Sequence, residues 1–97
     1  MPHLIWNNSA LRDLRRCYTF IAVKNPAAAA HAIRAIRERM QIVVDHPGAG
    51  RPVKLLDQSF REWIITYGDS GYVVRYRLRG DQVVIVAVKH QREAGFR

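Results

Sequence analysis

Residues 71–90 read GYVVRYRLRGDQVVIVAVKH, two runs of strand-forming residues separated by Gly80 and Asp81. In the first run, 72–79, an apolar and aromatic face alternates with a face that carries three arginines, and this period of two indicates a strand. The second run, 82–90, is apolar on both faces at its centre, which is typical of a central strand. A Gly-Asp pair between two such runs favours a tight hairpin turn. The stretch therefore predicts a β-hairpin whose second strand is central in a sheet.

The segment before the hairpin has a helical period instead. Three potential N-cap residues at 7–9 precede apolar residues that recur at helical spacing as far as Ile21. Asn25 and Pro26 then suit the cap and the first turn of a second helix, which ends at Pro47. The apolar positions of the two helices are Leu11, Leu14, Cys17 or Tyr18, Ile21, Ala29, Ile33, Ile36, Met40 and Val43. The run of alanines lets the helices approach closely, so we predict a helical hairpin.

Three further apolar runs add strands to the sheet. HLIW at 3–6 suits an edge strand, GAGRPVKLLD leads into a short strand near 53–57, and REWIITY at 61–67 predicts another strand. The predicted order is β-α-α-β-β-β-β within one domain, residues 1–97. The sequence therefore predicts an α+β fold, with the helical hairpin packed on one face of a small, mostly antiparallel sheet.

The charge of the chain predicts an anionic partner. Lys and Arg number 16 against 8 Asp and Glu, which gives a net charge of +8 and a pI near 10.6. Such an excess favours nucleic acid or an acidic protein as a partner. A single cysteine excludes an intrachain disulfide, and the chain shows no leader and no apolar run of membrane-spanning length. We therefore expect a cytoplasmic protein that is not bound to membranes.

The polar face of the strand at 72–79 is the first candidate site. Arg75, Arg77 and Arg79 would lie about 7 Å apart along the strand. Three like charges in a row repel one another, so we expect something to neutralise them. One interpretation is a solvated outer face paired with Glu62 or Asp81. The other is a groove that binds phosphate or carboxylate groups, and the residues alone leave both open.

His90 is the second candidate, because it lies where the central strand is predicted to leave the sheet near the arginine face. A histidine there can act as an acid or a base near neutral pH, although a surface or capping histidine is the competing interpretation. None of the four histidines has metal-ligand spacing to another His, Cys or acid, so we predict no metal and no cofactor. Cys17 lies on the apolar side of its helix and is interpreted as a small core residue.

Several short motifs, taken in order, resemble the RelE/ParE family, the toxins of bacterial type II toxin–antitoxin modules. They are DL at 13–14, NPAAA at 25–29, HPGAGRP at 46–52, RE at 61–62, GYVVRYR at 71–77 and HQRE at 90–93, after a first strand that contains Trp6. The resemblance covers nearly the whole chain. It implies the fold described above and an acidic, partly disordered antitoxin, with a homodimer or a toxin–antitoxin heterotetramer as the assembly.

The family that the chain resembles has two branches, ribosome-dependent mRNA endonucleases and inhibitors of DNA gyrase. The nuclease branch depends on basic residues in its third strand, an arginine after GY, an arginine near the end of the last strand and a C-terminal tyrosine. The corresponding positions here are Ile64 and Thr66, Val73, Gln91 or Arg92, and Phe96. Most of the nuclease set is missing, although His90 matches variants of that branch that use histidine. HPGAGRP and the alanine-rich hairpin are more similar to the gyrase-directed branch.

The resemblance therefore implies a non-enzymatic toxin that inhibits growth by binding DNA gyrase and is neutralised by its antitoxin. The residues expected to bind the target or the antitoxin are Arg61, Arg75, Arg77, His90 and Arg92. The alternative is a metal-independent endonuclease that acts on mRNA at the ribosome, with His90 and Arg92 as catalytic residues. A further alternative is a non-toxic, basic binding module. A partner that adds a strand is expected to dock at the edge strand 3–6 or 53–57.

Overall fold

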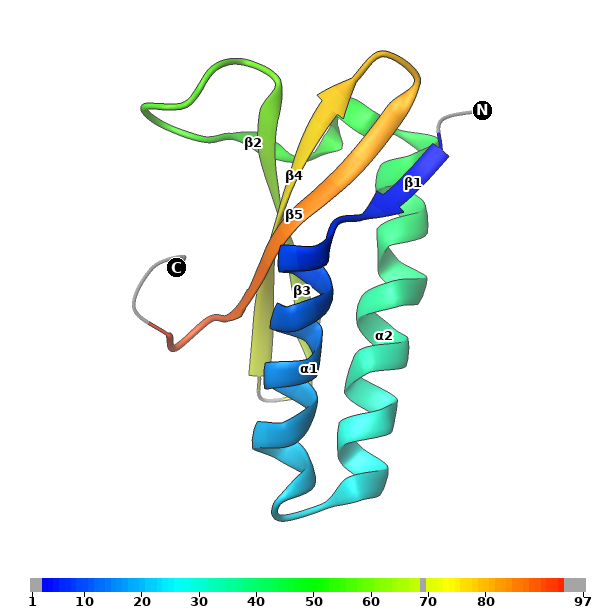
Figure 1. Cartoon of the computed structure of the whole chain (residues 1–97), viewed down its shortest axis with the longest axis vertical. Helices are drawn as coiled ribbons and strands as arrows, with labels where there is room; N and C mark the ends of the chain where they lie inside the picture. The colour runs from blue at the N-terminus through cyan, green and yellow to red at the C-terminus, as the bar shows by residue number, and fades with distance from the viewer. Residues whose placement is uncertain (1–2, 69, 94–97) are drawn as a thin grey trace.

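A five-stranded sheet with two antiparallel helices on one face forms the fold (Figure 1). The computed structural model describes residues 3–68 and 70–93. Its elements are β1 His3–Trp6, α1 Asn8–Ala22, α2 Pro26–Asp45, the 3-10 turn η1 Pro47–Ala49, β2 Arg51–Pro52, β3 Phe60–Tyr67, β4 Ser70–Arg79 and β5 Gln82–His90. The strand order is β1-β5-β4-β3-β2, and only the β1–β5 pair is parallel. The predicted α+β class and element order are confirmed.

The helices begin where the sequence predicts. Asn7 caps α1 by accepting a 2.9 Å hydrogen bond from the N–H of Ala10, and Asn25 caps α2 by accepting one of 3.1 Å from Ala28. Pro26 occupies the first turn of α2, where no intrahelical donor is needed. Within the described ranges, no helix is long and apolar enough to cross a membrane.

The core lies between the helical hairpin and the inner face of the sheet. Tyr72, Val74 and Tyr76 of β4 point into it and are at most 2% exposed, so the predicted alternation is confirmed. The other large buried side chains are Ile36, Met40 and Val43 of α2, Ile65 of β3, and Val83, Ile85 and Val88 of β5. Cys17 of α1 is also buried, as predicted.

The strand predicted near 53–57 is wrong. β2 has only two residues, and the next outward N–H of β3, that of Phe60, donates to the carbonyl of Asp57 in the loop instead of to a further β2 residue. The chain then leaves the sheet as a loop that projects beyond it, visible at the upper left of Figure 1. Leu55 in this loop is fully exposed and has a φ of +69°, which lies outside the range of strand residues.

A bulge at Val86 changes the register between β4 and β5. From the turn upward, Arg79 lies opposite Gln82 and Tyr76 opposite Ile85, whereas Arg75 lies opposite Ala87. One residue of β5 is therefore extra. Because neighbouring side chains alternate between faces, every residue of β5 beyond the bulge lies on the face opposite to the one that a regular hairpin would give.

Helix α1 covers the part of β5 that β1 leaves free. β1 pairs with residues 82–85 only. Beyond them, the carboxylate of Asp13 accepts a 2.8 Å hydrogen bond from the N–H of Val88, and Arg16 donates one of 3.1 Å to the Val88 carbonyl. Side chains of α1 therefore take the place of a neighbouring strand along this edge.

Candidate functional site

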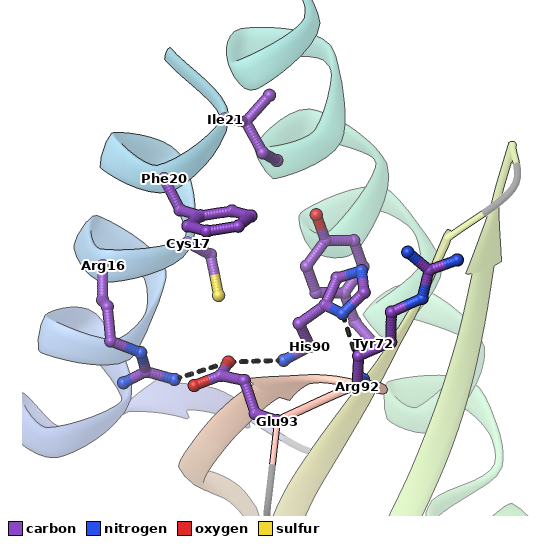
Figure 2. Close-up of a pocket in the computed structure, with 8 residues that line it drawn as sticks. All are labelled: Arg16, Cys17, Phe20, Ile21, Tyr72, His90, Arg92 and Glu93. Atoms are coloured by element: carbon purple, nitrogen blue, oxygen red, sulfur yellow. Dashed lines mark hydrogen bonds and ion pairs between the residues drawn. The ribbon is translucent and has the colours of Figure 1, made fainter. Parts of the chain in front are cut away.

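A pocket of about 500 Å³ opens between the second half of α1 and the end of β5 (Figure 2). It is lined by Arg16, Cys17, Phe20 and Ile21 of α1, Tyr72 of β4, and His90, Arg92 and Glu93. The bulge in β5 is the reason for this composition, because it brings His90 opposite Tyr72 on the face that α1 covers. The pocket therefore combines an apolar floor with charged groups on its rim.

The charged groups of the rim mostly bind each other. Arg16 donates to Asp13 at 2.6 Å and to Glu93 at 3.1 Å, and the same Glu93 oxygen accepts a 2.8 Å hydrogen bond from the N–H of His90. Arg16 is thus flanked by two carboxylates, and Glu93 has both a cation and a main-chain donor. This part of the rim holds the end of β5 against α1.

The imidazole of His90 has a defined orientation. Its ring stands edge-on to Tyr72, with 5.3 Å between the ring centres and an angle of 87° between the planes. Nδ1 accepts a 3.1 Å hydrogen bond from the N–H of Arg92, so the neutral ring carries its proton on Nε2. Nε2 is consequently the atom through which His90 can donate a proton or a hydrogen bond.

The floor of the pocket is not chemically reactive at neutral pH. Burial raises the pKa of the Cys17 thiol to about 11, and burial also raises the pKa of the Tyr72 hydroxyl. Both groups are therefore protonated near pH 7, and a thiol is a poor nucleophile. Phe20 at the rim is 79% exposed, which is unusual for a phenylalanine beside an apolar floor. These features fit an apolar side chain better than a phosphate.

The arginine face of β4 lies on the opposite side of the sheet. Arg75 donates to Glu62 at 3.0 and 3.3 Å, so the interpretation of a face paired with Glu62 is confirmed for this residue. Arg77 donates to the hydroxyl of Ser59 at 3.2 Å and lies over the ring of Phe60, 5.1 Å from its centre. Asp81 pairs instead with His3, at 3.8 Å.

Arg61 has a structural position. It projects toward η1, where its guanidinium donates to the carbonyls of Gly50 at 2.7 Å and Gly48 at 3.4 Å. The hydroxyl of Tyr76 binds the same turn, accepting from the N–H of Gly50 and donating to the carbonyl of Pro47, both at 2.8 Å. The motif HPGAGRP is therefore a turn that Arg61 and Tyr76 fix to the sheet.

The five predicted site residues thus fall into three places. His90 and Arg92 share the pocket, Arg75 and Arg77 lie on the outer face, and Arg61 is bound to η1. The expectation that His90 lies near the arginine face is wrong, since the bulge at Val86 turns it to the helix side.

The positions corresponding to the nuclease set do not form a cationic cluster. Ile64 and Thr66 are exposed on β3, and Val73 is buried in β4. Phe96 lies outside the residues that the structure describes. Sequence reasoning missed Arg16, Phe20, Tyr72 and Glu93 as pocket residues. In the sequence, Arg16 could have been noticed only because it stands three residues after Asp13, beside the apolar stripe of α1, a spacing that favours an ion pair on a helix.

The sequence of the chain is similar to those of known toxins. A family profile described as "ParE toxin of type II toxin-antitoxin system, parDE" matches residues 4–95. The chain is 34% identical over 84 residues to "Toxin RelE3" of Caulobacter vibrioides, covering 87% of this chain and 88% of that protein. It is 32% identical over 81 residues to "Toxin RelE1" of the same organism, covering 84% of each.

Solved structures show the same arrangement of helices and strands. The structure described as "Chromosomal ParDE TA system from P. aeruginosa" superimposes with a TM-score of 0.74 and 26% identity, covering 93% of this chain and 96% of that one. A toxin–antitoxin complex, RelBE2 of Mycobacterium tuberculosis, has a TM-score of 0.55 and 20% identity, covering 94% of this chain and all of that one. The second likeness concerns the fold alone.

Proposed function

Because the chain belongs to the ParE toxin family of type II toxin–antitoxin systems, we propose that it arrests growth by binding DNA gyrase and that a co-encoded acidic antitoxin neutralises it. In this proposal the toxin is a binder and not an enzyme. The wider RelE/ParE family contains both gyrase inhibitors and mRNA endonucleases, so the choice between them depends on the arrangement of the charged groups.

The sheet separates the candidate site residues, and this separation supports the gyrase proposal. Cleaving RNA through its 2′-hydroxyl requires an acid, a base and cations within hydrogen-bonding reach of one phosphate. Here His90 and Arg92 lie on the helix side, whereas Arg75 and Arg77 lie on the outer side, and Arg75 is already paired with Glu62. Arg75 and Arg77 therefore cannot join His90 and Arg92 at a single phosphate.

Charge complementarity supports an acidic protein partner. The chain has a net charge of +8, and the apolar pocket with Arg92 on its rim suits a segment that presents apolar and acidic side chains. Phe20, exposed beside the pocket, adds apolar surface that a partner can cover. An acidic antitoxin fits both properties.

Two residues of the pocket support the nuclease alternative. His90 presents Nε2 with its proton, and Arg92 lies beside it on the same rim. A substrate phosphate at this end of the sheet would contact a proton donor and a cation, which are two of the groups that the reaction needs. The nuclease hypothesis therefore predicts that His90 is essential.

Induction of the chain without its antitoxin distinguishes the two targets. The gyrase proposal predicts loss of negative supercoiling in plasmid DNA and induction of the DNA-damage response, with ribosome-bound mRNA intact. Translation-dependent cuts in mRNA, with normal supercoiling, would contradict the proposal. An absence of any growth defect would instead support the non-toxic binding module.

A second experiment compares His90→Ala with His31→Ala, which changes an exposed histidine of α2. If the chain is a nuclease, His90→Ala abolishes toxicity and leaves antitoxin binding intact, whereas His31→Ala changes neither. Under the gyrase proposal, both variants still cause loss of negative supercoiling. If His90 contacts gyrase, this loss is smaller with His90→Ala than with His31→Ala. Complete and selective loss of mRNA cleavage in His90→Ala would establish the nuclease alternative.

A further inference from the structure

The sheet has two stretches of unpaired edge, one on β5 and one on β3, and they differ in whether other groups bind their main chain. β1 covers only residues 82–85 of β5, and β2 covers only Arg61 and Glu62 of β3. Residues 86–90 and residues 63–67 therefore pair with β4 on one side and have no strand on the other. An uncovered edge presents main-chain donors and acceptors that another strand can pair with.

The free stretch of β5 is closed by side chains. The N–H and C=O of Val88 bind Asp13 and Arg16 of α1. The N–H of His90 binds the carboxylate of Glu93, and its C=O accepts from the N–H of Glu93 at 3.0 Å. All four main-chain groups of Val88 and His90 have partners, so no strand can pair with these two residues on this side.

The free stretch of β3 is almost completely open. In an antiparallel ladder the N–H and C=O of alternate residues point to the same side. The carbonyl of Thr66 points away from β4, because it accepts a hydrogen bond from Arg39 of α2. The main chain of Ile64, two residues earlier, points the same way, and no described residue bonds to its N–H or C=O or to the N–H of Thr66.

The side chains around this stretch favour an apolar and acidic occupant. Ile64 is 47% exposed, although natural edge strands are usually guarded by charge or proline. Arg39 lies at one end of the stretch and Arg51 of β2 at the other, 59% exposed. Glu62, the acid beside them, is already bound by Arg51 and Arg75. The local field is therefore positive.

We propose that the edge of β3 from Trp63 to Tyr67 is where an extended acidic segment of the antitoxin adds a strand to the sheet. The inference rests on the proposed antitoxin partner and is independent of the gyrase target. The added strand pairs with Ile64 and Thr66, covers the side chain of Ile64, and brings carboxylates to Arg39 and Arg51. The edge strands expected from the sequence, 3–6 and 53–57, have no part in it.

Hydrogen exchange at single amides tests the proposal directly. In the free chain, the amides of Trp63 and Ile65 bond to β4 and exchange slowly, whereas those of Ile64 and Thr66 exchange fast. In the complex with the antitoxin encoded beside this chain, we expect the exchange of Ile64 and Thr66 to slow at least tenfold. Unchanged fast exchange of both amides in the complex would overturn the proposal.

A matched pair of variants provides the second test. Ile64→Pro removes an outward N–H and leaves the ladder with β4 complete, because an edge position tolerates proline. Ile64→Thr keeps the N–H and the β-branched shape. We expect the first to weaken antitoxin binding at least tenfold and the second less than threefold, with equal circular dichroism spectra. Equal affinity of a folded Ile64→Pro variant would contradict the proposal, and if this variant does not fold, hydrogen exchange decides.

Two other outcomes are distinguishable. If the wild-type chain forms no complex with that antitoxin, the proposed partner is wrong, and the added strand is wrong with it. If the free chain is a dimer in sedimentation and its Ile64 and Thr66 amides are already protected, a second copy of the chain occupies the edge and the proposal is overturned.

Discussion

The hydroxyl of Tyr76 accepts a 2.8 Å hydrogen bond from the main-chain N–H of Gly50. The same hydroxyl donates to the carbonyl of Pro47, so one buried side chain in the middle of the sheet fixes the turn that follows α2. This turn sets the start of β2, and hence which residues of β3, Arg61 and Glu62, have β2 as a neighbour.

Replacing Tyr76 with Phe is expected to lower the free energy of unfolding by about 1–3 kcal/mol, because it leaves the buried N–H of Gly50 without an acceptor. Urea denaturation measures the change. Tyr18→Phe is the control, since Tyr18 is 40% exposed and its loss of a hydroxyl should change stability by less than about 0.5 kcal/mol. Equal stabilities of the two variants would show that the hydrogen bond contributes nothing.

Gly50→Ala is expected to destabilise the chain by about 1–3 kcal/mol or more, because overpacking of a rigid site is costly. A Cβ at Gly50 would lie against the Tyr76 hydroxyl and 2.8 Å from the carbonyl oxygen of Glu62. Gly48→Ala is the matched control in the same turn, because its Cβ would meet no atom within 4 Å. Thermal unfolding of both variants checks this, and equal midpoints would refute the steric account.

Asp13→Ala is expected to cost about 1–3 kcal/mol, because the N–H of Val88 loses its acceptor and Arg16 loses a counter-ion. The effect should also appear as faster amide exchange at Val88, since the end of β5 is no longer held against α1. Arg12→Ala, at an exposed position of the same helix, is the control. Slow exchange at Val88 in the Asp13 variant would mean that the edge is closed by other groups.

The buried thiol of Cys17 predicts a loss of stability at alkaline pH. Its pKa is raised by burial from 9.0 to about 11 in the folded chain, so the thiol ionises first in the unfolded chain. This contribution is complete below pH 9 and is lost as the pH rises toward 11. The pKa values of Tyr72 and Tyr76, also raised by burial, act in the same direction.

Denaturation of the wild type and Cys17→Ala across pH 7–11 isolates the thiol. The stability difference between them should be constant up to about pH 9 and should then shift in favour of the variant. In parallel, iodoacetamide should label native Cys17 much more slowly at pH 8 than it labels the urea-unfolded chain. Equal labelling rates in the two states would contradict a buried, protonated thiol.

The order of elements could be predicted from the sequence because each element has its own signal. The N-caps at Asn7 and Asn25 and the turn at Gly80 depend on local chemistry and lie where they were predicted. The strand near 53–57 was wrong because apolar residues there looked like a strand, whereas the N–H of Phe60 bonds to Asp57 of the loop and Leu55 adopts a positive φ.

The composition of the pocket could not be predicted, because it depends on one residue. A regular hairpin would place His90 opposite Gly71, on the arginine face. The bulge at Val86 places it opposite Tyr72, facing α1. No local pattern in the apolar run 82–90 marks the position of a bulge, so residues of α1 such as Arg16 could not be connected with His90 in advance.

The strand order has a consequence for the synthesis of the chain. β5 follows the other described elements along the chain, yet in the sheet it lies between β1, the earliest of them, and β4. Until residue 90 has left the ribosome, β1 has no strand to pair with and the inner face of β4 is only partly enclosed. A nascent chain, or one terminated before β5, therefore cannot complete its sheet, and a cell that makes this protein meets a folded toxin only after residue 90 has been translated.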